Sequence, residues 1–123
     1  MRKIVCSIFI LGSFLLLFPS CYNDNEYDLY PFPGCDSTNV TYSQTIAPIM
    51  SANCNVCHST AAGSGGVVTE TYDGMLVIVN NGRLWTDVSW GSGADQMPKG
   101  GSKLSPCDLG KIKKWINLGS PNN

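Results

Sequence analysis

The chain has few charged residues and a long stretch without a basic one. Of its 123 residues, 14% are charged, and the formal net charge is −1. No Lys or Arg occurs between Cys21 and Gly82. A nucleic-acid-binding protein usually presents a broad basic surface, so this pattern argues against nucleic acid as a partner. The length allows one domain at most, and no internal repeat is present.

The chain also lacks an apolar run long enough to cross a bilayer comfortably. The apolar residues 4–18 follow Arg2 and Lys3 and end before Pro19 and Ser20. This order is typical of a secretory signal peptide, which we assign to residues 1–20. The alternative is an anchor helix that is retained.

Cys21 lies where a bacterial lipoprotein signal would be cut. The segment Phe18-Pro19-Ser20-Cys21 resembles a relaxed lipobox, in which Pro19 is an unusual residue. We therefore predict that Cys21 is lipidated and anchors the protein to a membrane. The alternative is cleavage near Ser20, with Cys21 as an ordinary thiol.

Residues 21–40 form an acidic, Pro-containing segment, which we expect to be a tether. Acidic residues directly after a lipidated Cys resemble the surface-export signals of Bacteroidota lipoproteins. This resemblance implies an exported protein, either in the periplasm or attached to the outer membrane. It also implies that the protein could be exposed at the cell surface.

One short motif carries most of the chemistry: Cys54-Asn55-Val56-Cys57-His58. Cys-x-x-Cys-His is the attachment sequence of a c-type haem. Two thiols at this spacing can add to the two vinyl groups of one porphyrin edge, and the adjacent His can bind the iron. The motif predicts one covalent haem c, with His58 as an axial ligand.

Three other uses of a Cys-x-x-Cys pair compete with this interpretation. A structural zinc site needs four ligands, and the fourth could be only Cys35, Cys107 or a carboxylate. A thioredoxin-like redox pair needs a preceding strand in a βαβ frame, which the sequence does not suggest. The third use is a short-loop disulfide.

The remaining cysteines indicate a disulfide. Of six cysteines, Cys6 leaves with the signal, Cys21 is the lipidation site, and two belong to the haem motif. Cys35 and Cys107 are left as an even pair in an exported protein, so we predict a bond between them. The alternative is two buried free thiols.

His58 is the only histidine, so a second axial ligand must be of another type. Three methionines follow the signal segment. Met50 belongs to the helix that enters the motif, and Met75 has the spacing of a packing residue. Met97 lies in a Gly-rich loop and precedes Pro98, which favours an extended backbone. We predict that Met97 is the distal ligand; the alternative is a Met that fills a gap in the core.

The pattern of apolar residues predicts three helices. The first begins at Thr41 or Ser43 and runs toward Asn53, either starting near Pro48 or kinking there. The second covers roughly residues 70–80, although its Val and Ile content also suits a strand. The last begins at the cap Ser105, with Pro106 and Asp108 in its first turn. Glycine-rich loops are expected over residues 59–69 and 91–103.

Together, the Cys54–His58 motif, the Met97-Pro98 loop and the Trp115-containing last helix resemble a small monohaem class I cytochrome c. The resemblance covers roughly residues 40–120. It implies a cytochrome c-like domain over residues 41–123, an all-α fold around one covalent haem. It also implies that the first and last helices cross, which would bring Ile46 or Ile49 against Ile112 or Trp115. One departure is that no Pro follows the motif, so another carbonyl must accept the His58 ring proton.

The resemblance implies an electron-transfer protein with His/Met ligation and a redox protein as its partner, not an enzyme. A five-coordinate haem enzyme or sensor is the first alternative, and a non-haem surface lipoprotein is the second. Arg83 is expected either to contact a haem propionate or to be solvated at the surface. Lys99 and Lys103 could attract an acidic partner. Three aromatic residues could wall the haem: Tyr72, Trp85 and Trp90.

Overall fold

The structure is a computed structural model that describes residues 34–123, and every regular element within this range is helical. The predicted all-α class is therefore confirmed for this part of the chain. The predicted signal peptide, the Cys21 lipidation site and most of the tether lie outside the described residues. The elements are η1 (Tyr42–Ile46), α3 (Ala47–Asn53), α4 (Asn55–His58), η2 (Ser64–Gly66), α5 (Tyr72–Asn80), α6 (Arg83–Ser89) and α7 (Pro106–Asn117).

The first helix begins where the sequence predicts. Thr41 caps η1 by accepting a hydrogen bond from the Gln44 amide through its side chain. The amides of Ile46 and Ala47 bond to carbonyls five residues earlier, so η1 is a π-helical turn that leads into α3. Pro48 lies in the first turn of α3. Pro48 has no amide hydrogen, so a regular helix would lose its bond to the carbonyl four residues earlier. The π-helical turn lies directly before this position.

The second predicted helix is confirmed, but the element after it was not predicted. Thr71 caps α5 through its side chain, which accepts from the Gly74 amide. The helix ends at Asn80, and Gly82 with φ of 77° starts α6 after a two-residue break. Helix α6 has no side-chain cap and only seven residues, which explains why the sequence pattern did not reveal it.

Helix α7 follows the prediction closely. The Ser105 hydroxyl accepts from the Asp108 amide at 3.0 Å and donates to its carboxylate at 2.8 Å. At the other end, Gly119 has φ of 85°, and its amide bonds to the Ile116 carbonyl at 2.9 Å. This left-handed conformation suits glycine and ends the helix.

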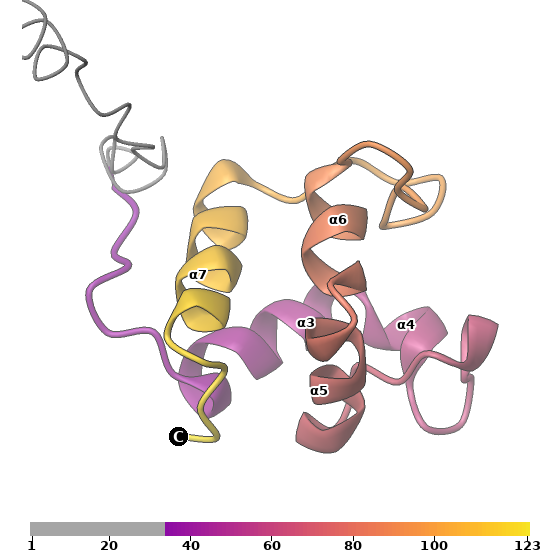
Figure 1. Ribbon diagram of the computed structural model, residues 1–123, viewed down its shortest axis with the longest axis horizontal. Coiled ribbons are helices and arrows are strands. Elements are labelled where there is room, and N and C mark those ends of the chain that lie inside the picture. The colour runs from indigo at the N-terminus through magenta and orange to yellow at the C-terminus, as the bar shows by residue number, and fades with distance from the viewer. Residues whose placement is uncertain (1–33) are drawn as a thin grey trace, which may run out of the picture.

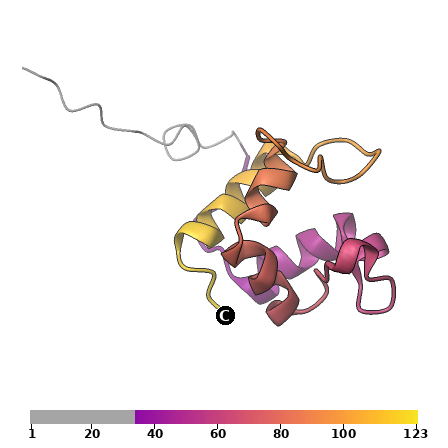
Figure 2. The same ribbon diagram turned by 45° about the vertical axis from the view of Figure 1, so that its right-hand side comes forward.

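The core lies between the first helix and α5, α6 and α7. Figure 1 shows α7 and α6 next to each other, with α5 below α6, and Figure 2 shows α3 below both α6 and α7. Trp115 of α7 is fully buried, and its ring lies 5.7 Å from that of Tyr42 in η1. First and last helices therefore pack together, as the resemblance implies. The buried cluster is Val40, Tyr42, Ile46, Ile49, Met50, Met75, Ile78, Leu84, Val88, Leu104, Leu109, Ile112 and Trp115.

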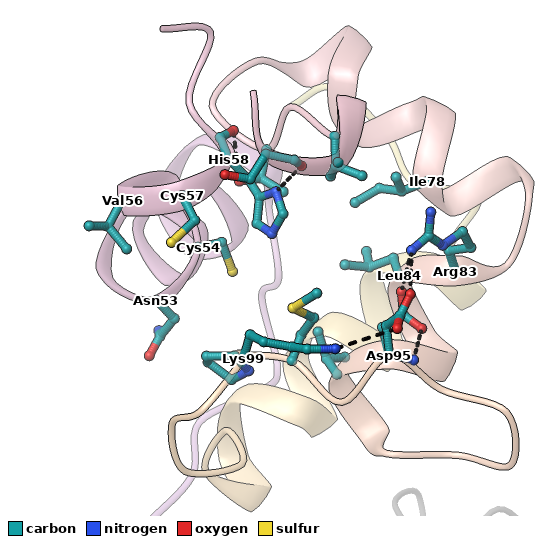
Figure 3. Close-up of a pocket in the computed structure, with 18 residues that line it drawn as sticks. Asn53, Cys54, Val56, Cys57, His58, Ile78, Arg83, Leu84, Asp95 and Lys99 are labelled. Atoms are coloured by element: carbon teal, nitrogen blue, oxygen red, sulfur yellow. Dashed lines mark hydrogen bonds and ion pairs between the residues drawn. The ribbon is translucent and has the colours of Figure 1, made fainter. Parts of the chain in front are cut away.

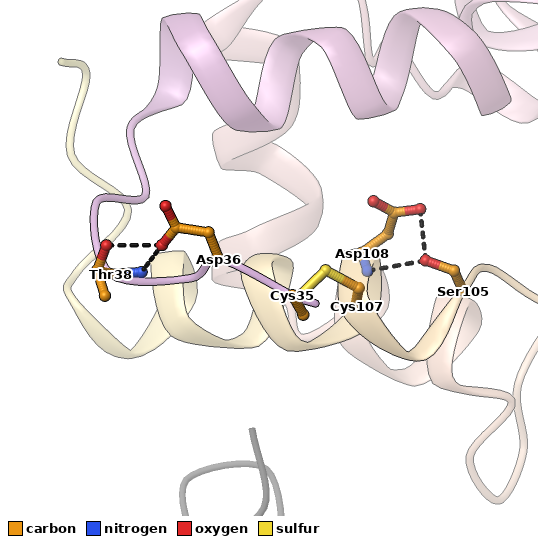
Figure 4. Close-up of a disulfide and its surroundings, with 6 residues drawn as sticks. All are labelled: Cys35, Asp36, Thr38, Ser105, Cys107 and Asp108. Atoms are coloured by element: carbon orange, nitrogen blue, oxygen red, sulfur yellow. Dashed lines mark hydrogen bonds between the residues drawn. A yellow bond between two sulfur atoms is a disulfide. The ribbon is translucent and has the colours of Figure 1, made fainter. Parts of the chain in front are cut away.

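The predicted disulfide between Cys35 and Cys107 is present. The two Cα atoms are 5.5 Å apart, and 72 positions separate them in sequence. Figure 4 shows the bond joining the segment before the first helix to the first turn of α7. Lys114, further along α7, donates to the Ser37 carbonyl at 2.7 Å. The segment is thus fixed to α7 at two points.

Within residues 34–123, none of the helices has the length and apolar character needed to cross a membrane.

Candidate functional site

A cavity of about 460 Å³ opens between the Cys54–His58 motif and the loop after α6. Figure 2 shows α4 with its following loop on the same side of the molecule as the α6–α7 loop. Cys54, Cys57, His58 and Met97 all line this cavity. The four residues predicted from the sequence to bind one cofactor therefore lie around one space. The remaining lining residues are Asn53, Val56, Ser64, Gly65, Val67, Thr69, Ile78, Arg83, Leu84, Asp87, Val88, Asp95, Pro98 and Lys99.

The two cysteines occupy the junction between α3 and α4. Cys54 ends α3 and precedes α4, so the chain turns there and carries Cys57 on the next helical turn. Both are free thiols, and their sulfur atoms point toward the space below His58 in Figure 3. Cys54 is partly buried against the core, and this desolvation raises the pKa of its thiol to about 11. Cys57 is exposed.

His58 is oriented by a backbone carbonyl that the sequence did not identify. Its Nδ1 lies 3.1 Å from the carbonyl oxygen of Ser64. When Nδ1 carries the proton, it donates to this carbonyl and leaves Nε2 with a free lone pair. Figure 3 shows this second ring nitrogen pointing into the cavity. The Ser64 carbonyl is therefore the acceptor near the His58 ring that the sequence left unidentified.

The loop that supplies the Ser64 carbonyl is held in place at both ends. Thr69 is buried; its amide donates to the His58 carbonyl at 2.7 Å, and its hydroxyl donates to Asn55 at 2.9 Å. The hydroxyl and amide of Thr60 both donate to Glu70. These hydrogen bonds hold the pKa of the Glu70 carboxyl below its ordinary value. The loop therefore keeps the His58 ring in one orientation.

The three methionines differ in burial and in whether they line the cavity. Met50 and Met75 are fully buried in the core, and neither lines the cavity. Met97 is partly exposed and lines it. Of the methionines within residues 34–123, Met97 alone can offer its thioether to a group bound in this space.

A cluster of charged side chains forms one rim of the cavity. Arg83 contacts Asp87 at 3.4 Å and Asp95 at 3.2 Å. Lys99 lies 3.6 Å from Asp95. Figure 3 shows Arg83, Asp95 and Lys99 at this rim. The four charges sum to zero, so the guanidinium is already paired with carboxylates of this chain.

The aromatic residues do not form the cavity wall that we expected. Tyr72 packs on Tyr42 in the core, with ring centroids 5.0 Å apart. Trp85 lies under the Lys113 ammonium, 4.6 Å from the ring centroid. Trp90 donates to the Met97 carbonyl at 2.8 Å. The apolar wall comes instead from aliphatic side chains of α5 and α6: Ile78, Leu84 and Val88.

The structure argues against a zinc site and against a thioredoxin-like redox pair at the Cys-x-x-Cys motif. Cys35 and Cys107 are bonded to each other, so neither can serve as a zinc thiolate. No group of three or more His, Cys, Asp or Glu side chains within residues 34–123 is arranged to hold a metal ion. The pair follows a helix, whereas a thioredoxin-like motif follows a strand.

No protein-family model matches the chain, and no curated protein or solved structure shows a significant match to it.

Proposed function

We propose that this protein is an electron carrier that holds one covalent haem c in the cavity between α4 and the Met97 loop. The observation that carries the proposal is the convergence of Cys54, Cys57, His58 and Met97 on one space. These residues are spread over more than forty positions of the sequence, yet they supply two thiols, an imidazole and a thioether to the same cavity. This is the donor set of a c-type haem with His/Met ligation.

The cavity suits such a group in size and character. Small-molecule and cofactor sites typically measure about 300–1,000 Å³ and are mostly apolar, and this cavity of about 460 Å³ has an aliphatic wall from α5 and α6. The sulfur atoms of Cys54 and Cys57 would form the two thioether bonds. His58, at the end of α4, and Met97, in the loop after α6, would bind the iron. This agreement supports the cytochrome c-like domain over residues 41–123.

A haem held here supplies a one-electron iron couple. The Ser64 carbonyl fixes the tautomer and orientation of His58, so its Nε2 stays available as a ligand. Met97 would occupy the remaining axial position, so no site would be open for substrate, which favours electron transfer over catalysis. Arg83 lies at the rim and could exchange an aspartate partner for a propionate.

The experiment is to produce the full chain in a bacterium that exports proteins and matures c-type haem. We expect one haem that stays attached after acid denaturation, and a weak absorption band at the red edge of the oxidised spectrum, which marks Met–iron ligation. Met97→Ala should remove that band, while Met75→Leu, in the core, should keep it. A high-spin spectrum of the unsubstituted protein would favour the five-coordinate enzyme or sensor. Absence of attached haem would overturn the proposal.

The proposed partner is an acidic redox protein, met by the basic side chains near the Met97 loop. Lys99 lies at the cavity rim, but Asp95 is 3.6 Å away and offsets part of its charge. Lys103 lies over Trp90, with its Nζ 6.0 Å from the ring centroid. Reversing both charges in Lys99→Glu/Lys103→Glu should slow electron exchange with a small acidic redox protein at low salt. Lys111→Glu on α7 is the matched control, and an unchanged rate in the double variant would exclude this surface.

The proposed location is outside the cytoplasm, on a membrane through lipidated Cys21. The disulfide between Cys35 and Cys107 supports this location, because such bonds persist in an oxidising compartment. Mass spectrometry of the N-terminal peptide would test it: a diacylated and N-acylated Cys21 is expected, and an unmodified thiol would contradict it.

A further inference from the structure

The last turn of α6 holds the backbone of Met97 on both sides. The Met97 amide donates to the Asp87 carbonyl at 3.1 Å. The Met97 carbonyl accepts a hydrogen bond from Nε1 of Trp90 at 2.8 Å. Both main-chain polar groups of the predicted distal ligand are therefore bonded to residues at or just beyond the end of a single helix. Figure 3 shows Lys99, two residues further along the same loop, across the cavity from His58.

Trp90 adopts a backbone conformation that a tryptophan rarely adopts. It is the residue after α6, with φ of 57° and ψ of 42°, in the left-handed region. This region is unfavourable for a residue other than glycine, because its Cβ atom comes too close to the following carbonyl oxygen. Its amide bonds to the carbonyls of Thr86 and Asp87, which closes the helix end. A glycine could end the helix equally well. The indole of Trp90, however, makes contacts with Met97 and Lys103 that a glycine could not make.

The indole also connects the two ends of the glycine-rich loop. Trp90 precedes the loop, its N–H bonds to Met97 in the middle, and the Lys103 ammonium from the far end lies over its ring. An ammonium about 6 Å from a ring centroid is attracted to the ring face. A second loop contact comes from the Asp95 amide, which donates to the Asp87 carboxylate at 3.2 Å. Four glycines within residues 91–101 would otherwise leave this loop many conformations.

We propose that Trp90 is the positioning residue that keeps Met97 at the cavity wall. The inference rests on the proposed function, because it treats Met97 as the distal ligand. The indole hydrogen bond fixes the Met97 carbonyl, so the side chain stays facing the cavity and is not released with the loop. Loss of this bond frees the loop, lowers the share of molecules with Met97 on the iron, and so lets an added ligand compete more easily.

The test compares Trp90→Phe with Trp85→Phe in the haem-loaded full chain. Phe keeps an aromatic ring but lacks the N–H donor. Trp85 is the matched control because it lies on α6 and does not line the cavity. The readout is the concentration of imidazole that displaces the methionine, followed by loss of the red-edge band. One hydrogen bond corresponds to roughly a two- to tenfold change in an equilibrium, so Trp90→Phe should bind imidazole two- to tenfold more tightly.

Equal imidazole affinity in Trp90→Phe and the unsubstituted protein would overturn the positioning role. An equal gain in Trp85→Phe would also overturn it, because the effect would then be a general loss of packing. Trp90→His, which keeps a ring N–H, should restore part of the original affinity. Absence of covalent haem, seen by mass before any substitution, would instead overturn the proposed function.

A second measurement avoids substitution altogether. Hydrogen exchange of the indole N–H groups in the unsubstituted protein should show Trp90 protected. Trp115 provides the reference, because its Nε1 donates to the Pro121 carbonyl at 2.9 Å within the core. If the Trp90 indole N–H exchanged at the rate of free tryptophan, its hydrogen bond to the Met97 carbonyl would be contradicted, whether or not haem is bound.

Discussion

The two cysteines of the Cys54–His58 motif differ in their environment. Cys54 is partly buried beside the core, and desolvation raises the pKa of its thiol from 9.0 to about 11. Cys57 lies exposed on the next helical turn. A buried thiol resists ionisation, and the thiolate is the reactive form. The motif therefore contains one readily accessible thiol and one that the fold protects.

This difference predicts a pH dependence for alkylation of the haem-free protein. The folded-state pKa of Cys54 is raised, so its thiolate fraction should increase about tenfold per pH unit until about pH 11. Site-resolved mass spectrometry after short iodoacetamide pulses would measure the rate at Cys54 alone. The same peptide alkylated in urea is the control, and there the rate should level off near pH 9. A folded-state rate that levels off at the same pH would contradict the burial effect.

The same pKa shift affects stability. Between pH 9 and 11 the unfolded chain ionises Cys54 while the folded chain keeps it protonated, so the haem-free protein should lose stability as pH rises. We expect Cys54→Ser to remove this part of the loss. Urea unfolding of both proteins at pH 8 and pH 10.5 would measure it, and parallel losses in the two would contradict the assignment.

The methionines lead to opposite stability predictions. Met75 is fully buried, so Met75→Ala should lower the free energy of unfolding by about 2–5 kcal/mol through the cavity it leaves. Met97 is partly exposed at the cavity wall, so Met97→Ala should cost less than about 1 kcal/mol in the haem-free chain. Urea unfolding measures both. A larger loss from Met97→Ala would mean that Met97 is a core residue.

Helix α5 contains a glycine whose substitution should be harmful. A Cβ on Gly74 would overlap the backbone carbonyl of Val68 and crowd the Thr71 cap. In an exposed helix, Gly→Ala gains about 1 kcal/mol, but here Gly74→Ala should lower stability because backbone atoms must move. Val77→Ala, at an exposed position of the same helix, is the control and should change stability by less than about 0.5 kcal/mol. Thermal unfolding would measure the effect. A Gly74→Ala protein that unfolds at the same or a higher temperature than the unsubstituted protein would contradict the predicted clash.

The helices that the sequence predicts are those that carry local side-chain signals. Thr41, Thr71 and Ser105 each accept a hydrogen bond from the amide three residues ahead. Thr41 and Ser105 were predicted as caps, whereas the second helix was predicted from its apolar residues without the Thr71 cap. Helix α6 has no such cap, because Gly82 has no side chain. The acceptor for His58 was equally hidden. It depends on how a loop with several left-handed glycines folds, and no pairwise spacing encodes that path.

At the scale of the molecule, the cavity joins two segments that are separate in sequence. One is the motif and the loop after it, residues 53–69, and the other runs from α5 to the Met97 loop, residues 78–99. The sequence pointed to four side chains in these segments that line the cavity: Cys54, Cys57, His58 and Met97. It did not predict which aliphatic side chains form the wall between them, because that follows from how α5 and α6 pack on α3 and α7.

The disulfide should stabilise the whole domain. Closing a loop of this length removes conformational entropy from the unfolded chain, worth about 4 kcal/mol in the chain-entropy model. Cys35→Ser/Cys107→Ser should therefore unfold at a markedly lower urea concentration. The double variant leaves no new free thiol, and Cys54 and Cys57 remain unchanged. An unchanged midpoint would show that hydrogen bonds such as Lys114 to Ser37 fix the segment by themselves.

The disulfide also decides which part of the protein would bear mechanical tension. A pull between the N-terminal segment and the end of the chain passes from Cys35 through the sulfur atoms to Cys107 and along α7. Residues 36–106 lie inside the covalent loop, and every residue that lines the cavity is among them. A domain pulled at these two ends would thus keep its cavity outside the covalent path of the load, while α7 carried the strain.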